Sequence, residues 1–158
     1  MEKATFAAGC FWEVQILFED LDGVESTVVG YTDGNTENPS YEEVYTDKTG
    51  HAEAIEIVYN PEKVNYEALL DIFWNNHNPT TLNQQGEDVG TRYRSAIFYH
   101  NDEQKRLAEE SMKAFEEVAQ KRFKKPIVTV IHEASSFYKA EDYHQSYLKR
   151  QGKTTCSL

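Results

Sequence analysis

The sequence predicts an α+β fold in which helices cover a mainly antiparallel sheet built around a split β-α-β (ferredoxin-like) core. Segments of strand and helix character follow one another in the order β-α-β, long loop, β-α, loop, β-α-β. The 158 residues suit one domain with its own core, and no repeat or low-complexity stretch divides them. We therefore expect one domain over residues 1–158, with long loops and an irregular, mobile tail over residues 151–158.

The N-terminal segment predicts a strand, a sharp turn and a helix. Residues 4–8 are mostly apolar and have the pattern of the end of a strand, and Val14 and Phe18 lie one helical turn apart. Cys10 therefore falls at a strand-to-helix turn. After a glycine turn, residues 24–32 are rich in β-formers and predict the next strand.

A polar loop and a short helical turn come next. Residues 33–39 are almost all turn-forming types, and Ser40 can cap the N-terminus of a helical turn over residues 41–45. Glu43 stands at the position that completes a capping box. Residues 52–59 then alternate as a strand.

The phase of this strand places a carboxyl group among apolar side chains. Residues two apart point to the same face, so Glu53 shares a face with Ile55, Ile57 and Tyr59. Burial on that face would raise the pKa of the carboxyl group. The alternative is that the strand begins after Glu53, which would leave the carboxylate in solvent.

The second half of the chain predicts further helices and strands. Asn65 can cap a helix over residues 66–76, and residues 102–123 form the clearest helix. The apolar stripe of that second helix reads as core, not as a cofactor site. Strands are expected over residues 95–99 and 127–132.

Two other segments carry weaker patterns. Residues 77–94 are too polar and too rich in glycine for an element of their own, and a loop this long in a compact domain is usually functional. A loop and a short aromatic helix are expected around residues 138–148.

Composition and charge exclude several classes of protein. The formal net charge is −11, and the one basic run, over residues 121–125, is better explained as the C-terminal cap of a helix than as a nucleic-acid surface. No apolar run approaches the about 20 residues of a membrane span, and the N-terminal residues lack the apolar region of a secretion signal. Two cysteines are too few for a disulfide scaffold. We expect a monomer in the reducing cytoplasm that binds neither nucleic acid nor membranes.

Metal and nucleotide sites are not expected. No HExxH or CxxC spacing occurs, and glycine-rich phosphate-binding loops are absent. The histidines are scattered along the sequence at His51, His77, His100, His132 and His144. The sequence therefore predicts neither a metal nor a cofactor.

The strongest candidate for chemistry is Cys10, with Phe11 and Trp12 beside it. A thiol at the start of a helix faces free N–H groups, which together with the helix dipole favour the nucleophilic thiolate. The two aromatic rings would suit an apolar, sulfur-bearing substrate. Two other interpretations stay open: Cys10 as a small core residue, and Cys10 paired with a histidine in a thiol hydrolase.

Six separated segments together resemble one enzyme family, almost from end to end of the chain. They are Gly9-Cys10-Phe11-Trp12, Gly30-Tyr31-Thr32, Asn38-Pro39-Ser40-Tyr41-Glu42-Glu43-Val44, Thr49-Gly50-His51-Ala52-Glu53-Ala54, the run over residues 83–97 and Ala140-Glu141-Asp142-Tyr143-His144-Gln145. In content and order they look like the peptide methionine sulfoxide reductases of the A class. The resemblance implies a single catalytic domain that reduces the S-epimer of methionine sulfoxide, free or in proteins.

The resemblance also implies roles for individual residues, position by position. These are Cys10 as the nucleophile, Glu53 as the acid, Phe11 and Trp12 as the walls that hold the S-methyl group, Tyr41 and Tyr93 as the phenols that bind the sulfoxide oxygen, and Asp88 as a polar residue of the same pocket. The chemistry is consistent, because a sulfoxide oxygen is a poor leaving group until it is protonated, and a buried carboxyl group can protonate it. Attack by Cys10 on sulfur would leave methionine and a sulfenic acid.

Two positions depart from the pattern of the family. Glu13 stands where the family commonly has glycine, and its carboxylate opposes a Cys10 thiolate although it can also cap the helix. Tyr45 stands where some members have a cysteine. Cys156 is then the only thiol left to resolve the sulfenic acid, and we expect recycling by thioredoxin or a similar dithiol. A thiol hydrolase and a non-catalytic module that binds oxidised methionine remain the alternatives.

Overall fold

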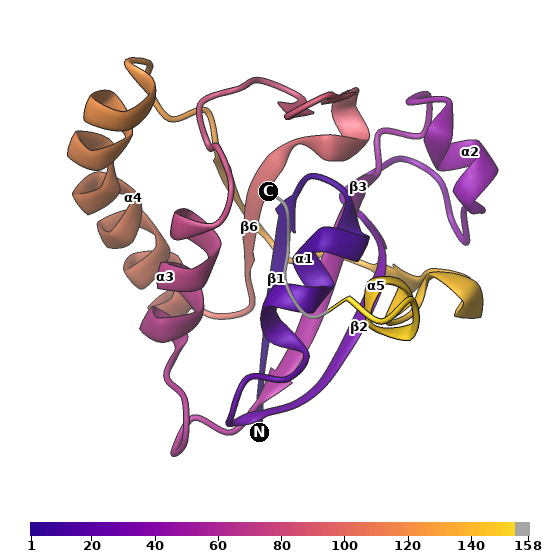
Figure 1. Cartoon of the computed structure of the whole chain (residues 1–158), viewed down its shortest axis with the longest axis horizontal. Helices are drawn as coiled ribbons and strands as arrows, with labels where there is room; N and C mark the ends of the chain where they lie inside the picture. The colour runs from indigo at the N-terminus through magenta and orange to yellow at the C-terminus, as the bar shows by residue number, and fades with distance from the viewer. Residues whose placement is uncertain (154–158) are drawn as a thin grey trace.

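The computed structural model describes residues 1–153, and a six-stranded sheet forms its centre (Figure 1). The strands lie side by side in the order β7-β6-β1-β3-β2-β8. Their bounds are β1 Glu2–Ala8, β2 Val24–Thr32, β3 Ala52–Tyr59, β6 Ser95–Tyr99, β7 Val130–Glu133 and β8 Phe137–Lys139. A separate hairpin is made of β4, Gln84–Gln85, and β5, Asp88–Val89.

The four central strands have the ferredoxin-like order β6-β1-β3-β2. Within this set of four, adjacent strands are antiparallel. β1 and β2 are therefore parallel with β3 between them, and helix α1 (Phe11–Phe18) connects them as a split β-α-β unit. β7 extends the sheet in parallel beside β6 after the long helix α4 (Asp102–Phe123), and β8 pairs antiparallel with β2. The predicted fold class is confirmed.

The main core lies between the sheet and the helices that cover it. The ring of Phe6 on β1 stacks on Phe18 of α1, with 5.7 Å between the ring centroids. Helix α3 (Tyr66–Asn75) packs beside α1, and α4 packs on α3, where Trp74 stacks on Phe115 at 5.6 Å (Figure 1). These contacts bury the apolar face of β3, on which Glu53 also lies.

Capping residues begin two of the helices where the sequence predicts. The Ser40 Oγ accepts a hydrogen bond from the Glu43 N–H at 3.2 Å, and the Glu43 carboxylate accepts one from the Ser40 N–H at 2.9 Å. This capping box begins α2 (Tyr41–Tyr45). The Asn65 side chain likewise accepts from the Ala68 N–H at the start of α3.

The segment over residues 77–94 is not the featureless loop that the sequence predicts. It contains the β4-β5 hairpin and a 3₁₀ turn, η1, over Thr91–Tyr93. Each strand of the hairpin has two residues, so the sequence holds no alternation that could reveal it.

The C-terminal region also differs from prediction. β7 begins at Val130 rather than at residue 127, because pairing with β6 starts there. The predicted aromatic helix over residues 138–148 is replaced by β8, a 3₁₀ turn η2 (Asp142–His144) and a four-residue helix α5 (Tyr147–Arg150). The reason is tertiary: the chain here pairs with the edge of β2, which local sequence does not record.

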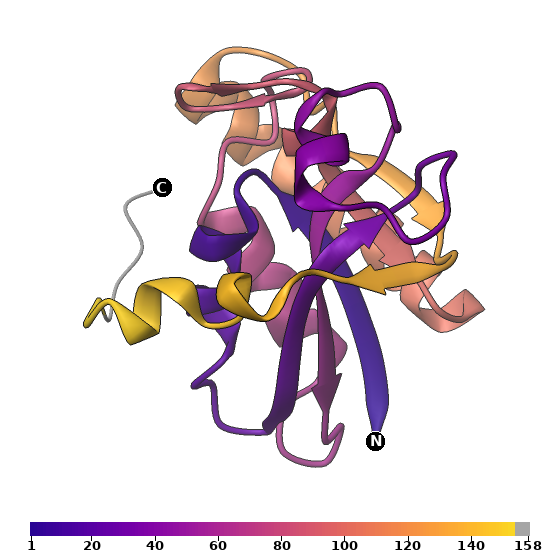
Figure 2. The ribbon, with the colours of Figure 1, turned by 90° about the vertical axis from the view of Figure 1, so that its right-hand side faces the viewer.

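The last described segment crosses the molecule beside β2 and α1, as Figure 2 shows in yellow. The expected tail falls mostly on residues 154–158, which lie outside the described residues. Cys156 is one of them. In residues 1–153, no helix has the length and apolar character needed to cross a membrane.

Candidate active site

The candidate site lies at one end of the sheet, where several connections meet (Figure 1). Because neighbouring strands are antiparallel, β1 and β2 end where β6 and β3 begin: Ala8 pairs with Ser95, and Thr32 pairs with Ala52. These connections carry the residues singled out in the sequence, which are Cys10, Phe11 and Trp12 after β1, Tyr41 after β2, Glu53 at the start of β3, and Asp88 and Tyr93 before β6.

Glu53 is buried, with 2% of its surface exposed, so the alternative that leaves it in solvent is wrong. Its Oε1 accepts a hydrogen bond from the backbone N–H of Phe11 at 3.1 Å. Burial raises the pKa of this carboxyl group to about 7, although the Phe11 N–H and the positive charge of Arg92 both lower it. The charge of Asp88 raises it further. Near neutral pH the carboxyl group is therefore divided between its acid and its ionised form.

Cys10 occupies the N-cap position of α1 and is partly exposed. Burial, then the charge of Glu53 and after it the charge of Glu13, raise the pKa of the thiol to about 12. The backbone N–H groups of Trp12 and Glu13 lower the pKa, as expected for a helix N-terminus, but burial outweighs them. The helix start therefore favours the thiolate as expected, but burial and the two carboxylates have the larger effect, and the pKa of the thiol in the resting protein is raised.

Tyr41 and Tyr93 reach the same region from two different connections. Burial, followed by the charges of Glu53 and Cys10, raises the pKa of Tyr41. Tyr93 is 8% exposed, and burial followed by the charge of Glu53 raises its pKa to about 12. Both phenols therefore keep their protons at neutral pH and can donate hydrogen bonds. The charge of Asp88, on the β4-β5 hairpin, acts on both Tyr93 and Glu53.

The two aromatic residues after Cys10 have different environments. The Phe11 ring is only 1% exposed and packs against Tyr31, with 5.7 Å between centroids. The Trp12 ring is partly exposed and stacks on Tyr147 of α5 at 3.9 Å. Trp12 therefore offers ring surface to a ligand, and Phe11 supports the site mainly from the core.

His144 and Glu141 belong to the site, although sequence reasoning gave them no role. His144 is 1% exposed, and its Nδ1 accepts a hydrogen bond from the Trp12 Nε1 at 3.0 Å. Glu141 accepts from the Tyr31 hydroxyl and from the Tyr41 N–H, each at 2.9 Å. Although burial raises the pKa of Glu141, these hydrogen bonds bring it below its ordinary value. Both residues lie in the segment over residues 140–145 that resembles the family, and this was the feature of the sequence that could have pointed to them.

No group of three or more His, Cys, Asp or Glu side chains within residues 1–153 is arranged to hold a metal ion. The described groups of the site that can take part in chemistry include a thiol, a carboxyl group and two phenols. Together they provide a nucleophile, a group that is partly protonated near neutral pH, and two hydrogen-bond donors.

Comparison with known proteins identifies the family. The family model described as peptide methionine sulfoxide reductase matches residues 2–158. Peptide methionine sulfoxide reductase MsrA of Methanothermobacter thermautotrophicus is 55% identical over 157 residues, which are 99% of this chain and 92% of that protein.

Solved structures agree with the sequence comparison. Methionine sulfoxide reductase A of Corynebacterium diphtheriae matches with a TM-score of 0.90 and 34% identity, covering 99% of this chain and 77% of that one. Mxr1 from Saccharomyces cerevisiae, in complex with Trx2, matches with a TM-score of 0.64 and 26% identity, covering 92% and 84% of the two chains. The chain therefore belongs to the peptide methionine sulfoxide reductase family, and it is an enzyme that reduces methionine sulfoxide to methionine.

Proposed function

We propose that this enzyme reduces the S-epimer of methionine sulfoxide, free or in proteins, with Cys10 as the nucleophile and Glu53 as the acid. The observation that carries the proposal is the hydrogen bond between the Phe11 N–H and the buried Glu53 carboxyl group, because it joins the Cys10 turn to the acid. A pKa of about 7 suits a group that must donate a proton at neutral pH.

The proposed first step transfers one oxygen atom. Cys10 Sγ attacks the sulfoxide sulfur while Glu53 protonates the sulfoxide oxygen, and the thiol proton of Cys10 replaces the proton that Glu53 gave up. The hydroxyl group then moves from the substrate sulfur to Sγ, so that the S–O bond of the substrate breaks and an Sγ–O bond forms. The bond between Sγ and the substrate sulfur breaks at the same time, its electron pair leaves with methionine, and Cys10 remains as a sulfenic acid. Methionine sulfoxide is reduced and the cysteine is oxidised, each by two electrons.

A protonated Glu53 helps this step in a second way. The negative charge of Glu53 is the largest electrostatic influence that raises the pKa of Cys10, after burial. When Glu53 is protonated that charge is absent, so the pKa of Cys10 is lower. The thiolate is therefore easier to form in the same state in which Glu53 can donate a proton.

In the proposal, Tyr41 and Tyr93 hold the sulfoxide oxygen and Asp88 lies in the same polar half of the pocket. The raised pKa values of the two phenols support this role, since each keeps its O–H donor at neutral pH. Trp12, with Phe11 behind it, holds the S-methyl group by apolar contact. An oxygen site and a methyl site on opposite sides of the sulfur make the pocket selective for one epimer.

The sulfenic acid must be reduced before the next turnover. Cys156 is the only other cysteine of the chain, and we propose that it forms a disulfide with Cys10 and releases water. Thioredoxin or a similar dithiol then reduces that disulfide. The complex of the yeast relative Mxr1 with Trx2 supports this partner. A chain with two cysteines and dithiol recycling suits a reducing compartment, and we propose the cytoplasm.

One experiment separates this function from its alternatives. The Cys156→Ser variant is mixed with an excess of methionine sulfoxide without reductant, and methionine and oxidised Cys10 are quantified in the same samples. The proposal predicts one methionine and one Cys10 sulfenic acid per enzyme. A binding module would release no methionine, and a thiol hydrolase would leave the sulfoxide intact and Cys10 unoxidised.

A further inference from the structure

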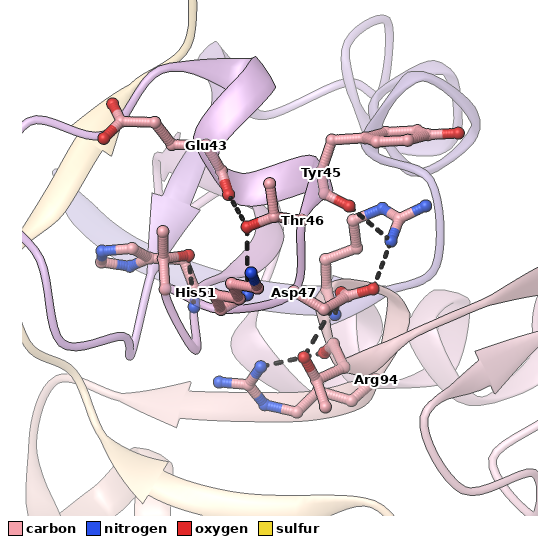
Figure 3. Close-up of polar contacts among 10 residues, drawn as sticks. Glu43, Tyr45, Thr46, Asp47, His51 and Arg94 are labelled. Atoms are coloured by element: carbon pink, nitrogen blue, oxygen red, sulfur yellow. Dashed lines mark hydrogen bonds and ion pairs between the residues drawn. The ribbon is translucent and has the colours of Figure 1, made fainter.

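An ion pair beside the site links two separate connections of the fold. The Asp47 carboxylate, in the loop after α2, lies 2.6 Å from the Arg92 guanidinium of η1, and the two side chains are 30% and 9% exposed. Asp47 also accepts from the Arg92 backbone N–H at 3.1 Å, and the Arg92 Nη1 also donates to the Tyr45 carbonyl at 3.2 Å. The Tyr45 carbonyl and the Asp47 carboxylate, whose residues are labelled in Figure 3, both accept hydrogen bonds from this guanidinium.

Aromatic contacts add to this link. The Arg92 guanidinium lies over the ring of Tyr45, with 4.4 Å between its carbon and the centroid, and over the ring of Tyr93 at 4.3 Å. A guanidinium over an aromatic face is attracted by the ring quadrupole, and more strongly where water is excluded. Arg92 thus holds Tyr93, while the largely exposed Tyr45 covers the guanidinium.

The backbone is adapted to this close approach. Asp47 adopts a left-handed conformation with φ at 61°, which an aspartate tolerates better than most residues. Gly90 has φ at 146°, and a Cβ there would lie 2.5 Å from the Asp47 Oδ2 and 2.8 Å from the Arg92 Nη1. A side chain at position 90 would therefore push Asp47 and Arg92 apart.

The two connections that are joined carry the two phenols of the proposed oxygen site. Tyr41 begins α2, and Tyr93 ends η1. Neither segment belongs to the six-stranded sheet, so their relative position depends on contacts such as these. An error of about 1 Å in the placement of catalytic groups can cost up to about 10²-fold in rate.

We propose that Asp47, Arg92 and the ring of Tyr45 form a brace between α2 and η1 that positions Tyr41 and Tyr93 around Glu53. This inference rests on the proposed roles of the two phenols and of Glu53. Asp47 and Arg92 are then positioning residues for sulfoxide reduction, and neither contacts the substrate.

The electrostatics of the site give this brace a second consequence. The charge of Arg92 lowers the pKa of Glu53, and the charges of Asp88 and Asp47 raise it. Among the described residues, other titratable groups that interact with Glu53 include Cys10, Tyr31, Tyr41 and Tyr93. Removing the charge of Arg92 should therefore raise the Glu53 pKa. A substitution that only loosens the fold would expose Glu53 to water and would not raise its pKa.

The chain offers a closely matched control for Asp47. Asp33 also has a left-handed backbone, with φ at 68°, and it pairs with Arg94 at 3.1 Å, with side chains that are 24% and 15% exposed. Asp47→Asn and Asp33→Asn thus each remove one carboxylate charge from an aspartate–arginine pair whose aspartate has a left-handed backbone. Asp33 differs in that its carboxylate also lies 3.2 Å from the His132 Nδ1. Only Asp47 lies in the brace.

The experiment measures two quantities in wild type, Asp47→Asn, Asp33→Asn, Arg92→Lys and Arg92→Met. One is the rate of the first turnover with free methionine sulfoxide and no reductant. The other is the midpoint of the Glu53 titration, followed through its carboxyl infrared band by subtracting the matching Glu53→Gln spectrum. Tyr45→Leu, at a largely exposed position, tests the brace by the same first-turnover rate should Arg92→Met fail to fold.

We expect Asp47→Asn and Tyr45→Leu to slow the first turnover about tenfold relative to Asp33→Asn. The Glu53 midpoint should rise in Arg92→Met and stay near the wild-type value in Arg92→Lys, which keeps the charge. Equal rates in Asp47→Asn and Asp33→Asn, or an unmoved midpoint in a folded Arg92→Met, would overturn the brace. If Glu53→Gln itself reacts at the wild-type rate, the proposed function fails instead.

Discussion

The backbone N–H of Phe11 donates a hydrogen bond to the carboxyl group of Glu53, across 3.1 Å. The two residues lie 42 positions apart in the sequence, one in the first turn of α1 and the other at the start of β3. The bond fixes the Cys10 turn against the buried acid, and together with the charge of Arg92 it lowers the Glu53 pKa while burial raises it. Nucleophile and acid are thus tied together through the backbone.

Stability should depend on pH through Glu53. The folded protein holds the Glu53 proton up to a pKa of about 7, whereas the unfolded chain releases it near the ordinary value of 4.5. The folded state therefore binds more protons between these values, and stability falls as pH rises from about 4.5 to 7. The loss of stability from this group is on the order of 3 kcal/mol.

Glu53→Gln removes this dependence. The free energy of unfolding of the variant, measured relative to wild type, should therefore increase between pH 4.5 and pH 8. Urea unfolding at the two pH values measures the change. Glu56→Gln, on the same strand but more accessible, controls for the loss of one carboxylate. A stability difference between Glu53→Gln and wild type that is the same at both pH values would show that the buried carboxyl group titrates normally.

The reactivity of the Cys10 thiol should increase when either neighbouring carboxylate is neutralised. Glu53 raises the Cys10 pKa more than Glu13 does, so Glu53→Gln should lower it more than Glu13→Gln. Alkylation rates across pH in the Cys156→Ser background measure both effects on a single thiol. Glu19→Gln, at the far end of α1, is the control. An unchanged or higher Cys10 pKa in Glu13→Gln would show that Glu13 does not raise the pKa of the nucleophile.

His144 should position the Trp12 ring. His144→Phe keeps a ring of similar size but leaves the Trp12 Nε1–H without its acceptor, which should raise the KM for methionine sulfoxide roughly two- to tenfold. Fluorescence in a Trp74→Phe background reports on Trp12 alone, because the chain has two tryptophans. His144→Asn, whose carbonyl can accept the bond, should recover part of the loss. Wild-type KM and emission in His144→Phe would assign the histidine to packing only.

Selectivity for one epimer should follow from the proposed oxygen and methyl sites. From a racemic sulfoxide, one epimer should be consumed and the other left, which chiral chromatography measures directly. Tyr41→Phe and Tyr93→Phe should each slow the first turnover by about 10²-fold, since each removes a donor to the developing charge on oxygen. Equal consumption of both epimers by wild type would mean that the oxygen is bound elsewhere.

Periodic patterns were sufficient to predict much of this molecule. The strand over residues 52–59 has a regular alternation, so the burial of Glu53 could be predicted from Ile55 and Ile57. The spacing of Ser40 and Glu43 predicted the capping box. The pKa of Cys10 could not be predicted in the same way, because burial, which dominates it, depends on how distant segments pack over the turn.

The missed elements depend on partners far away in the sequence. β8 exists because it pairs with β2, and the Trp12–His144 hydrogen bond joins residues 132 positions apart. The Asp47–Arg92 pair also spans two connections whose separate sequences contain no trace of the contact. Local propensity cannot report such pairings, since each segment acquires its structure from the other.

The rate of the first turnover in Glu53→Gln tests the proposed mechanism most directly. Glutamine keeps the size of the side chain and a carbonyl that can accept from the Phe11 N–H, but it has no acidic proton. Rapid-quench measurement of methionine formation at pH 7, with saturating sulfoxide and no reductant, should give a rate about 10²-fold below wild type. A wild-type rate in this variant would contradict the assignment of Glu53 as the acid.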